Sequence, residues 1–370
     1  MDTYPQSLTL PGAWVAAPSL SEEQLTGTFW TYGLLDCLPF TPFLVLAPDG
    51  LVGNYRHPNE DSWLVQDGRL AFMSDRGVCT TLFEAAKLQG GRIVGLAGRI
   101  RLAGSEQVVE LRRTDHPVHP LYPTPSDTNR EAEFIKTCEG PHRPNLVVLR
   151  AGNGSLHSSW TRDLTDQERS WDLCISFYGG ADALPQDAEY LTYQPKQRKF
   201  PAIYDLFRPG SPLWGYDRIW MPDDDLMTGW GDINLLFHLS RKHGLDLSQP
   251  SLQQRPDCYI THEITMQQPE STLRFVSFVE LMCPIFSKRA LEICIGSFRD
   301  CISGFGLDHL WPSFLGTPHV KVAIMDQVGI VHTRPVGVNY DLHQAAAEGL
   351  AMLDVYKIGF FRFPHQKVPF

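Results

Sequence analysis

The chain has 370 residues, of which 43% are hydrophobic, and its formal net charge at pH 7 is −10. This length allows two domains with a core each, and the hydrophobic share is ordinary for a soluble globular protein. The acidic balance extends along the whole chain without a basic stripe, which argues against binding to nucleic acid or to an anionic membrane surface.

The sequence carries no targeting or redox signal. The first residues, MDTYPQ, lack the positive region of a secretory signal, and no apolar run is long enough to cross a bilayer. Eight cysteines are scattered without a CxxC pair, which is typical of reduced thiols and not of a disulfide frame or a zinc site. We therefore expect a cytoplasmic protein.

Residues 1–115 are expected to form a small all-β module, either a sandwich or a barrel. Asp-Gly and Gly-Gly turns, typical of hairpins, separate strand-like runs at 43–47, 70–73, 92–100 and 107–111. The segment Thr80–Leu88 could instead form a helical turn.

The motif HPNEDSW offers Asn59, Glu60 and Trp63 as candidate ligand contacts, because an exposed indole stacks well on a sugar ring. Since Trp side chains are usually largely buried, we favour the alternative in which Trp63 fills the small core and Asn59 shapes a turn.

Residues 116–144 are expected to be a linker. The segment HPVHPLYPTPSD contains four prolines, a composition typical of extended or irregular chain. From Asn145 onward, apolar strands alternate with helical patterns. We therefore predict an α/β domain at 145–370 with a Rossmann-like, mostly parallel sheet.

Two continuous apolar strands, at 146–152 and 171–180, end in glycine-containing loops. Such loops allow close approach to a nucleotide, so Arg150, Gly152 and Asp182 are candidates for donor binding. The sequence has no GxGxxG after these strands, so a dinucleotide fold is not indicated.

Three basic residues, Lys196, Arg198 and Lys199, precede the short helical segment FPAIYDLF. Cations near the ends of parallel strands could hold a diphosphate. A solvated basic patch is the ordinary alternative.

The segment YDRIWMPDDDL places three carboxylates directly after a short apolar strand. Asp223, Asp224 and Asp225 would then lie at the carboxyl edge of the sheet, where open α/β sheets bind ligands. Neighbouring carboxylates repel each other unless a cation lies between them, and hard oxygen ligands suit Mg²⁺ or Mn²⁺. A solvated turn that caps the next helix is the plain alternative.

A helix is predicted at 232–244, with Asp232 as a plausible N-cap, and the strand LDLSQPSL follows it. The apolar segment 273–287 contains Glu280, and a carboxylate in such a setting requires a partner or a function. Pairing with Arg274 or with a backbone N–H is an equal alternative to a functional role.

Three later segments complete the prediction. In GFGLDHLW, a Gly-x-Gly loop sets Asp308 near a helix start with Trp311 one turn on, although Asp308 could be a helix cap only. In GIVHTR, His332 follows a strand and is a reasonable third metal ligand, although a lone His is more often structural. An Ala-rich helix at 339–358 and a tail that packs back on the body end the chain.

These segments together resemble a known family. The ordered set YDRIWMPDDDL, HGLDLSQPSL, FVELMCPIFS, GLDHLW and VGIVHTRPVG is similar to a little-characterised glycosyltransferase-like family, and to the GT-A fold of nucleotide-sugar transferases in general. The resemblance covers roughly residues 145–337, and the β module lies outside it.

The resemblance implies a role for each residue that matches. Asp223 and Asp225 would be the DxD pair that holds Mn²⁺ or Mg²⁺ on the donor diphosphate, with His332 completing the metal shell. Asp224 would face the donor sugar or ribose, and Asp308 would be the base that faces the acceptor. Beside these implied roles, we expect Glu280 and Trp311 to shape the acceptor pocket.

The expected function is metal-dependent transfer of a sugar from a nucleoside-diphosphate sugar, a UDP-sugar foremost, to a glycan or small-molecule acceptor. Arg150 or Lys199 would add positive charge near the departing diphosphate. Two rivals stay open. One is a non-catalytic glycan- or nucleotide-binding protein, with Trp63 of the β module as the contact. The other is a metal-dependent nucleotidyltransferase or phosphohydrolase, which would release pyrophosphate or phosphate.

Overall fold

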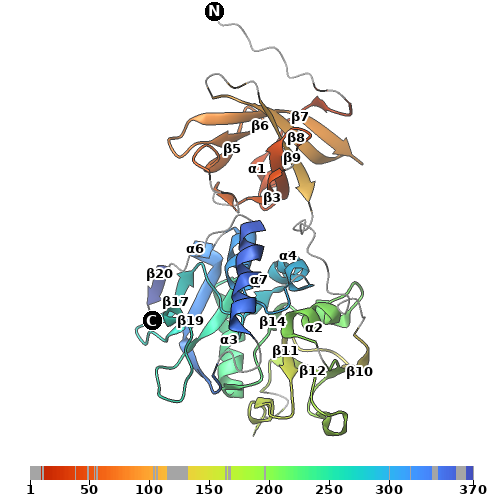
Figure 1. Cartoon of the computed structure of the whole chain (residues 1–370), viewed down its shortest axis with the longest axis vertical. Helices are drawn as coiled ribbons and strands as arrows, with labels where there is room; N and C mark the ends of the chain where they lie inside the picture. The colour runs from red at the N-terminus through yellow and green to blue at the C-terminus, as the bar shows by residue number, and fades with distance from the viewer. Residues whose placement is uncertain are drawn as a thin grey trace, which may run out of the picture. The chain divides into compact units, whose positions relative to one another are not determined.

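The computed structural model describes residues 10, 12–37, 39–47, 50–53, 55, 57–102, 105, 107–114, 132–162, 165, 168–195, 197–299, 301–316, 318–335, 341–355 and 364–369. The chain divides into two compact units, residues 1–120 with 354–358 and residues 121–353 with 359–370 (Figure 1). None of the helices in the described ranges is both long and apolar enough to cross a membrane.

The elements of the first unit are β1 (Val15–Ala16), α1 (Glu22–Leu25), β2 (Phe29–Leu34), β3 (Pro39–Leu46), β4 (Val52–Gly53), β5 (Ser62–Gln66), β6 (Arg69–Met73), β7 (Cys79–Gln89), β8 (Arg92–Ile100) and β9 (Val108–Thr114). Within the described ranges, nine strands form one antiparallel sheet in the order β4-β3-β2-β9-β8-β7-β6-β5, and β1 pairs with β7. An antiparallel bridge between Leu51 and Ser62 joins its two edges, so the sheet curls toward a barrel.

The structure of this unit tests two predictions made from the sequence. The helical turn expected at Thr80–Leu88 is wrong, because β7 is extended and pairs with β6 on one side and β8 on the other. Pairing on both edges outweighs the local helical preference. Trp63 is 5% exposed and donates from Nε1 to the carbonyl of Ala47 at 3.0 Å. It therefore fills the core of this unit, and Asn59 lies in the turn before it.

The elements of the second unit are β10 (Phe134–Lys136), β11 (Asn145–Ala151), η1 (His157–Ser159), β12 (Trp171–Phe177), η2 (Ala181–Ala183), β13 (Tyr190–Tyr193), α2 (Lys199–Leu206), η3 (Pro212–Gly215), β14 (Arg218–Trp220), β15 (Leu226–Met227), α3 (Trp230–Lys242), β16 (Leu247–Leu252), η4 (Glu263–Thr265), β17 (Ser271–Val276), β18 (Ile285–Ser287), α4 (Lys288–Arg299), α5 (Leu307–Leu315), α6 (Pro318–Lys321), β19 (Val322–His332), α7 (Leu342–Val355) and β20 (Pro364–Pro369).

The described strands of this unit form a mixed sheet in the order β10-β13-β12-β11-β14-β18-β16-β19-β17-β20. The run β13-β12-β11-β14 is parallel. Beyond it, β18 is antiparallel to both β14 and β16. The expectation of a mostly parallel sheet is therefore wrong, although β14, the strand before the three aspartates, does pair in parallel with β11.

Parallel strands covered on both faces read as continuous apolar runs. Every residue of β11 and β12 is buried. On one side, Phe200 of α2, Phe298 of α4 and Trp311 of α5 pack edge to face or tilted with ring centroids 5.1–5.4 Å apart. These contacts fix the helices that surround the carboxyl edge of the parallel strands.

Two boundaries differ from the sequence prediction. Residues 134–136 of the expected linker form β10, which pairs with β13, while residues 115–131 lie outside the described ranges. The N-cap of α3 is Gly229, not Asp232, which lies in the first turn. The tail does pack back as expected, because β20 pairs with β17.

Candidate active site

The carboxyl ends of three parallel strands bring the candidate residues together. Ala151 of β11 pairs with Phe177 of β12, and β14 lies parallel on the other side of β11. Gly152 and the three aspartates therefore emerge at one edge, as the sequence predicts, and Tyr178 emerges there with them. The aspartates do not share one environment, because each has a different set of partners.

Asp224 is 7% exposed and is held by hydrogen bonds from three directions. Its Oδ2 accepts from the backbone N–H of Gly152 at 2.9 Å and from the Tyr178 hydroxyl at 3.0 Å. Its Oδ1 lies 3.2 Å from the Arg334 guanidinium. The pKa of Tyr178 is raised, mainly because the side chain is buried and also because the Asp224 carboxylate lies beside it. The hydroxyl therefore keeps its proton and donates it in this hydrogen bond.

Gly152 is required by this arrangement. A Cβ at this position would lie 2.6 Å from the Tyr178 ring. The residue therefore acts by allowing Tyr178 and Asp224 to meet its backbone, and it is not among the residues that line the adjacent cavity.

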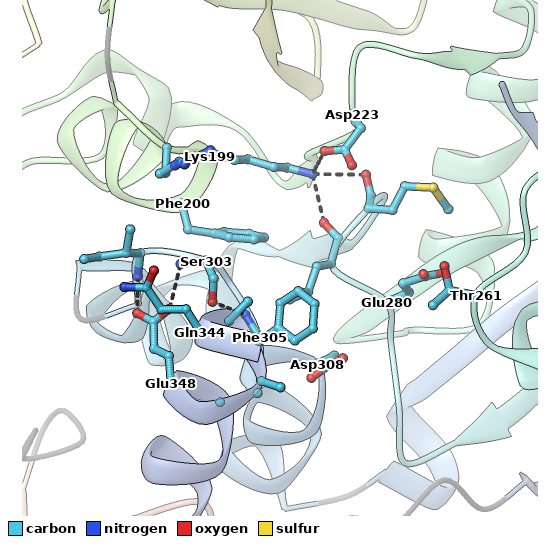
Figure 2. A pocket seen from close by; sticks show the side chains of 18 of the residues that line it. Lys199, Phe200, Asp223, Thr261, Glu280, Ser303, Phe305, Asp308, Gln344 and Glu348 are labelled. Carbon is cyan, nitrogen blue, oxygen red and sulfur yellow. Dashed lines mark hydrogen bonds and ion pairs between the residues drawn. The ribbon is translucent and has the colours of Figure 1, made fainter. Parts of the chain in front are cut away.

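Asp223 pairs with Lys199, whose Nζ lies 2.6 Å from Oδ1 (Figure 2). The same ammonium donates to the carbonyls of Leu281 at 2.8 Å and Met282 at 3.0 Å. Lys199 is thus a fixed positive charge at the carboxylate edge, not a solvated lysine.

Asp225 faces His332. The Nε2 atom of His332 lies 3.5 Å from Asp225 Oδ2, and its Nδ1 contacts the carbonyl of Tyr259 at 3.0 Å. Burial lowers the pKa of His332, but the hydrogen bond and charge of Asp225 outweigh it and the net shift is upward. The Oδ1 atom of Asp225 is buried and has no hydrogen-bond partner within the described part of the chain.

These contacts test whether a divalent cation fits. An orphaned carboxylate oxygen next to an imidazole whose other nitrogen is held by a carbonyl is a suitable pair of ligands. Mg²⁺ often takes only one or two carboxylates and adds substrate phosphates. Among the described residues, however, no group of three His, Cys, Asp or Glu is arranged to hold a metal. The chain therefore supplies two candidate ligands here, Asp225 and His332, and not a complete set, because Lys199 occupies Asp223.

A cavity of 1320 Å³ opens over this edge. Its described lining includes the three aspartates, Lys199, His332 and Arg334 at one end. Other lining residues are Thr261, Glu280, Asp308, His309 and Phe305. Figure 2 shows Glu280 beside Thr261, and Asp308 on the side of Phe305 away from the Lys199 ammonium. The volume exceeds the ~300–1,000 Å³ of common small-ligand sites, which leaves room for two substrates.

Asp308 lies in the first turn of α5 and is 8% exposed. The N-cap of this helix is Gly306, with φ of 91°, so Asp308 is not the cap. Its Oδ1 accepts from the N–H of His309 at 3.0 Å. Glu280 is 9% exposed, and Arg274 pairs with Asp326 at 2.7 Å instead of with Glu280.

Three sequence candidates are placed differently from expectation. Asp182 is exposed in η2 and does not line the cavity, because the turn after β12 carries it to solvent. Trp311 is fully buried and bonds Ser297 at 3.1 Å, so it belongs to the core and not to an acceptor pocket. Arg150 lines the cavity, but its guanidinium donates to the carbonyls of Ser176 and Gln197 at 3.2 and 2.8 Å.

Other residues need separate mention. Arg198 is the N-cap of α2 and lines the cavity, while Lys196 lies outside the described residues. The sequence analysis missed Tyr178 and Arg334. Arg334 follows His332 by two residues in GIVHTR, so a second polar residue beyond the same strand end was an available signal.

No protein-family model matches the chain, and no curated protein matches it. Among solved structures, residues 1–349 of TarS from S. aureus match with 10% identity over 56% of this chain and 71% of that chain, with a TM-score of 0.35. The same fragment in complex with UDP-GlcNAc matches with 9% identity over 57% and 65%, with a TM-score of 0.37. A putative nucleotide-diphospho-sugar transferase from Desulfovibrio desulfuricans G20 matches with 11% identity over 58% and 96%, with a TM-score of 0.29. Likenesses this distant carry no weight for function, which has to rest on the chain's own residues.

Proposed function

We propose that the protein is a glycosyltransferase that moves a sugar from a nucleoside-diphosphate sugar to an acceptor hydroxyl, with UDP-sugars the first donors to test. The observation that carries this proposal is that the three aspartates at the cavity contact three different groups. Asp223 holds an ammonium group, Asp224 orders the loop that follows β11, and Asp225 faces an imidazole. A separate carboxylate, Asp308, lines the same cavity.

In this proposal the donor diphosphate binds at the end with Lys199 and Arg334. The bond between the sugar and the diphosphate breaks, and the diphosphate leaves with the electron pair. Positively charged donors fixed before the reaction stabilise the charge that develops there. A divalent cation held by Asp225 and His332, when bound, supplies Lewis-acid stabilisation of the same charge.

The acceptor hydroxyl forms the new bond to the sugar, and its proton passes to Asp308 as general base. A base must lie within hydrogen-bond reach of the hydroxyl. Support comes from the position of Asp308 in the cavity wall with one carboxylate oxygen on the His309 N–H, which orients the carboxylate.

A thermal-shift screen of UDP, GDP and CDP, each with Mn²⁺, Mg²⁺ or EDTA, tests the proposal. A ligand that binds only the folded protein at ~100 times its Kd adds ~2.7 kcal/mol of stability. We expect one nucleotide to raise Tm more in the presence of metal than in EDTA. No shift with any nucleotide would overturn the proposal, and release of pyrophosphate during turnover would favour a nucleotidyltransferase.

Lys199→Met is expected to increase the affinity for Mn²⁺ in the absence of nucleotide by about tenfold, because it removes a competing cation from Asp223 and frees that carboxylate as a ligand. Direct titration with Mn²⁺ measures the change. Lys321→Met is the matched control, since Lys321 also donates to a carbonyl, that of Gly244 at 3.1 Å, but does not line the cavity. Equal Mn²⁺ affinity in Lys199→Met and the wild type would show that Lys199 does not compete with the metal.

A further inference from the structure

The described lining of the cavity carries both positive and negative side chains. The lysine and arginine residues in its described lining are Arg150, Arg198, Lys199 and Arg334. Lys199 pairs with Asp223 and Arg334 with Asp224, and the Arg150 guanidinium lies over the ring of Tyr178, which bonds Asp224. The lining also includes the carboxylates Glu280, Asp308 and Glu348, and Figure 2 shows Asp308 and Glu348 away from the Lys199 ammonium. An anionic acceptor would meet like charge there, which disfavours its binding.

The end remote from Lys199 is built by the N-terminal part of α7 against the loop that precedes α5. Glu348 of α7 accepts from the backbone N–H groups of Ile302 at 2.6 Å and Ser303 at 2.9 Å (Figure 2). Gly306 and Gly349 meet backbone to backbone, since a Cβ on Gly306 would lie 3.1 Å from the Cα of Gly349. This joint fixes α7 beside the first turn of α5, where Asp308 lies.

Large aliphatic side chains on this wall are exposed to water. Leu350, next to Gly349, is 54% exposed and Ile302 is 47% exposed, and both line the cavity. Phe305 and the small residues Ala345, Ala346 and Ala347 extend the same wall. Apolar surface left open in a concave site rimmed by polar groups is typical of a binding site for an apolar ligand group.

We propose that this wall, formed by Ile302, Phe305, Ala346 and Leu350, binds the apolar body of a small uncharged acceptor whose hydroxyl is directed to Asp308. The inference rests on the proposed transferase function and names the class of acceptor: a neutral amphiphile, not a wholly polar glycan and not an anionic one. The apolar body lies along α7, and the hydroxyl lies among Glu280, Thr261 and Asp308.

Isothermal titration of the full chain with hexyl β-D-glucopyranoside, below its micelle concentration, and with methyl β-D-glucopyranoside tests this class of ligand. Each fully buried methylene strengthens binding about fourfold. We expect the hexyl compound to bind about tenfold tighter or more, since two buried methylenes suffice for that ratio.

Two variants on α7 make the test specific. Leu350→Gln is expected to reduce the hexyl preference to about threefold or less. Leu342→Gln, at a position 47% exposed on the same helix but outside the described cavity lining, should leave the preference unchanged. Both positions are exposed, so neither change threatens folding.

Equal binding of the two glucosides, no binding of either, or an equal effect of the two variants would overturn the proposal. Titration with UDP in the presence of Mn²⁺ keeps the two proposals apart. If the protein prefers the hexyl glucoside but does not bind UDP, the transferase proposal is wrong and the apolar binding site remains. If it binds UDP but does not prefer the hexyl glucoside, only the proposal of an amphiphilic acceptor is wrong.

Discussion

Asp308→Asn is expected to lower turnover by about 10²–10⁴-fold, the range typical for loss of a general acid or base. Asparagine has nearly the same shape and keeps an oxygen that accepts from the N–H of His309, which Asp308 holds at 3.0 Å. It cannot take a proton from the acceptor hydroxyl. Steady-state kinetics with a saturating donor measures the loss.

The Kd for the donor nucleotide should stay within about twofold of wild type in Asp308→Asn, because catalysis loses a proton acceptor and not a binding charge. Glu280→Gln is the matched control, since Glu280 is a second carboxylate of similar burial in the same cavity. If turnover survives in Asp308→Asn and collapses in Glu280→Gln, the two residues exchange roles. If it survives in both, the general-base assignment is wrong.

The strands and the three aspartates of the site were predictable because their signals are local. The runs before Gly152 and before Asp223 are mostly apolar, and such runs form buried strands whose ends meet at one edge when they are parallel. The order of strands across the sheet was not predictable in the same way. From the alternation of β14, α3 and β16 one expects adjacent parallel strands, but β18, which comes later in the chain, lies between them.

Trp311, which was assigned to the wrong environment, and Arg334, which was not predicted, show what a single sequence does not reveal about side-chain contacts. Trp311 follows Asp308 by three residues, a spacing that allows a shared helix face, yet Trp311 packs among Phe200, Phe286 and Phe298. Both faces of α5 are buried. The periodicity of the sequence therefore does not show which of its residues face the cavity and which, like Trp311, pack in the core. Arg334 was missed because its partner Asp224 lies 110 residues earlier, and a single sequence carries no sign of that contact.

Asp225→Ala is expected to weaken Mn²⁺ binding by at least about 100-fold, since loss of an outer partner of a metal ligand alone costs ~10–100-fold and a direct ligand contributes more. The variant removes the orphaned Oδ1 atom and the oxygen that faces His332 at 3.5 Å. Metal-dependent binding of UDP should fall with it, while binding of UDP in EDTA should change little, because Lys199 and Arg334 remain in place. Titration with Mn²⁺, and with UDP with and without Mn²⁺, measures these changes.

Asp182→Ala is the matched control for this prediction. Asp182 also follows a parallel strand by a few residues, but its side chain is exposed in η2 and lies outside the described lining of the cavity. Its loss should leave Mn²⁺ affinity unchanged. An unchanged metal dependence in Asp225→Ala would mean that the Lys199 ammonium alone neutralises this edge, since Lys199 already contacts Asp223 and two carbonyls. Metal-independent transfer would then be the expected chemistry, and Lys199→Met the variant that loses it.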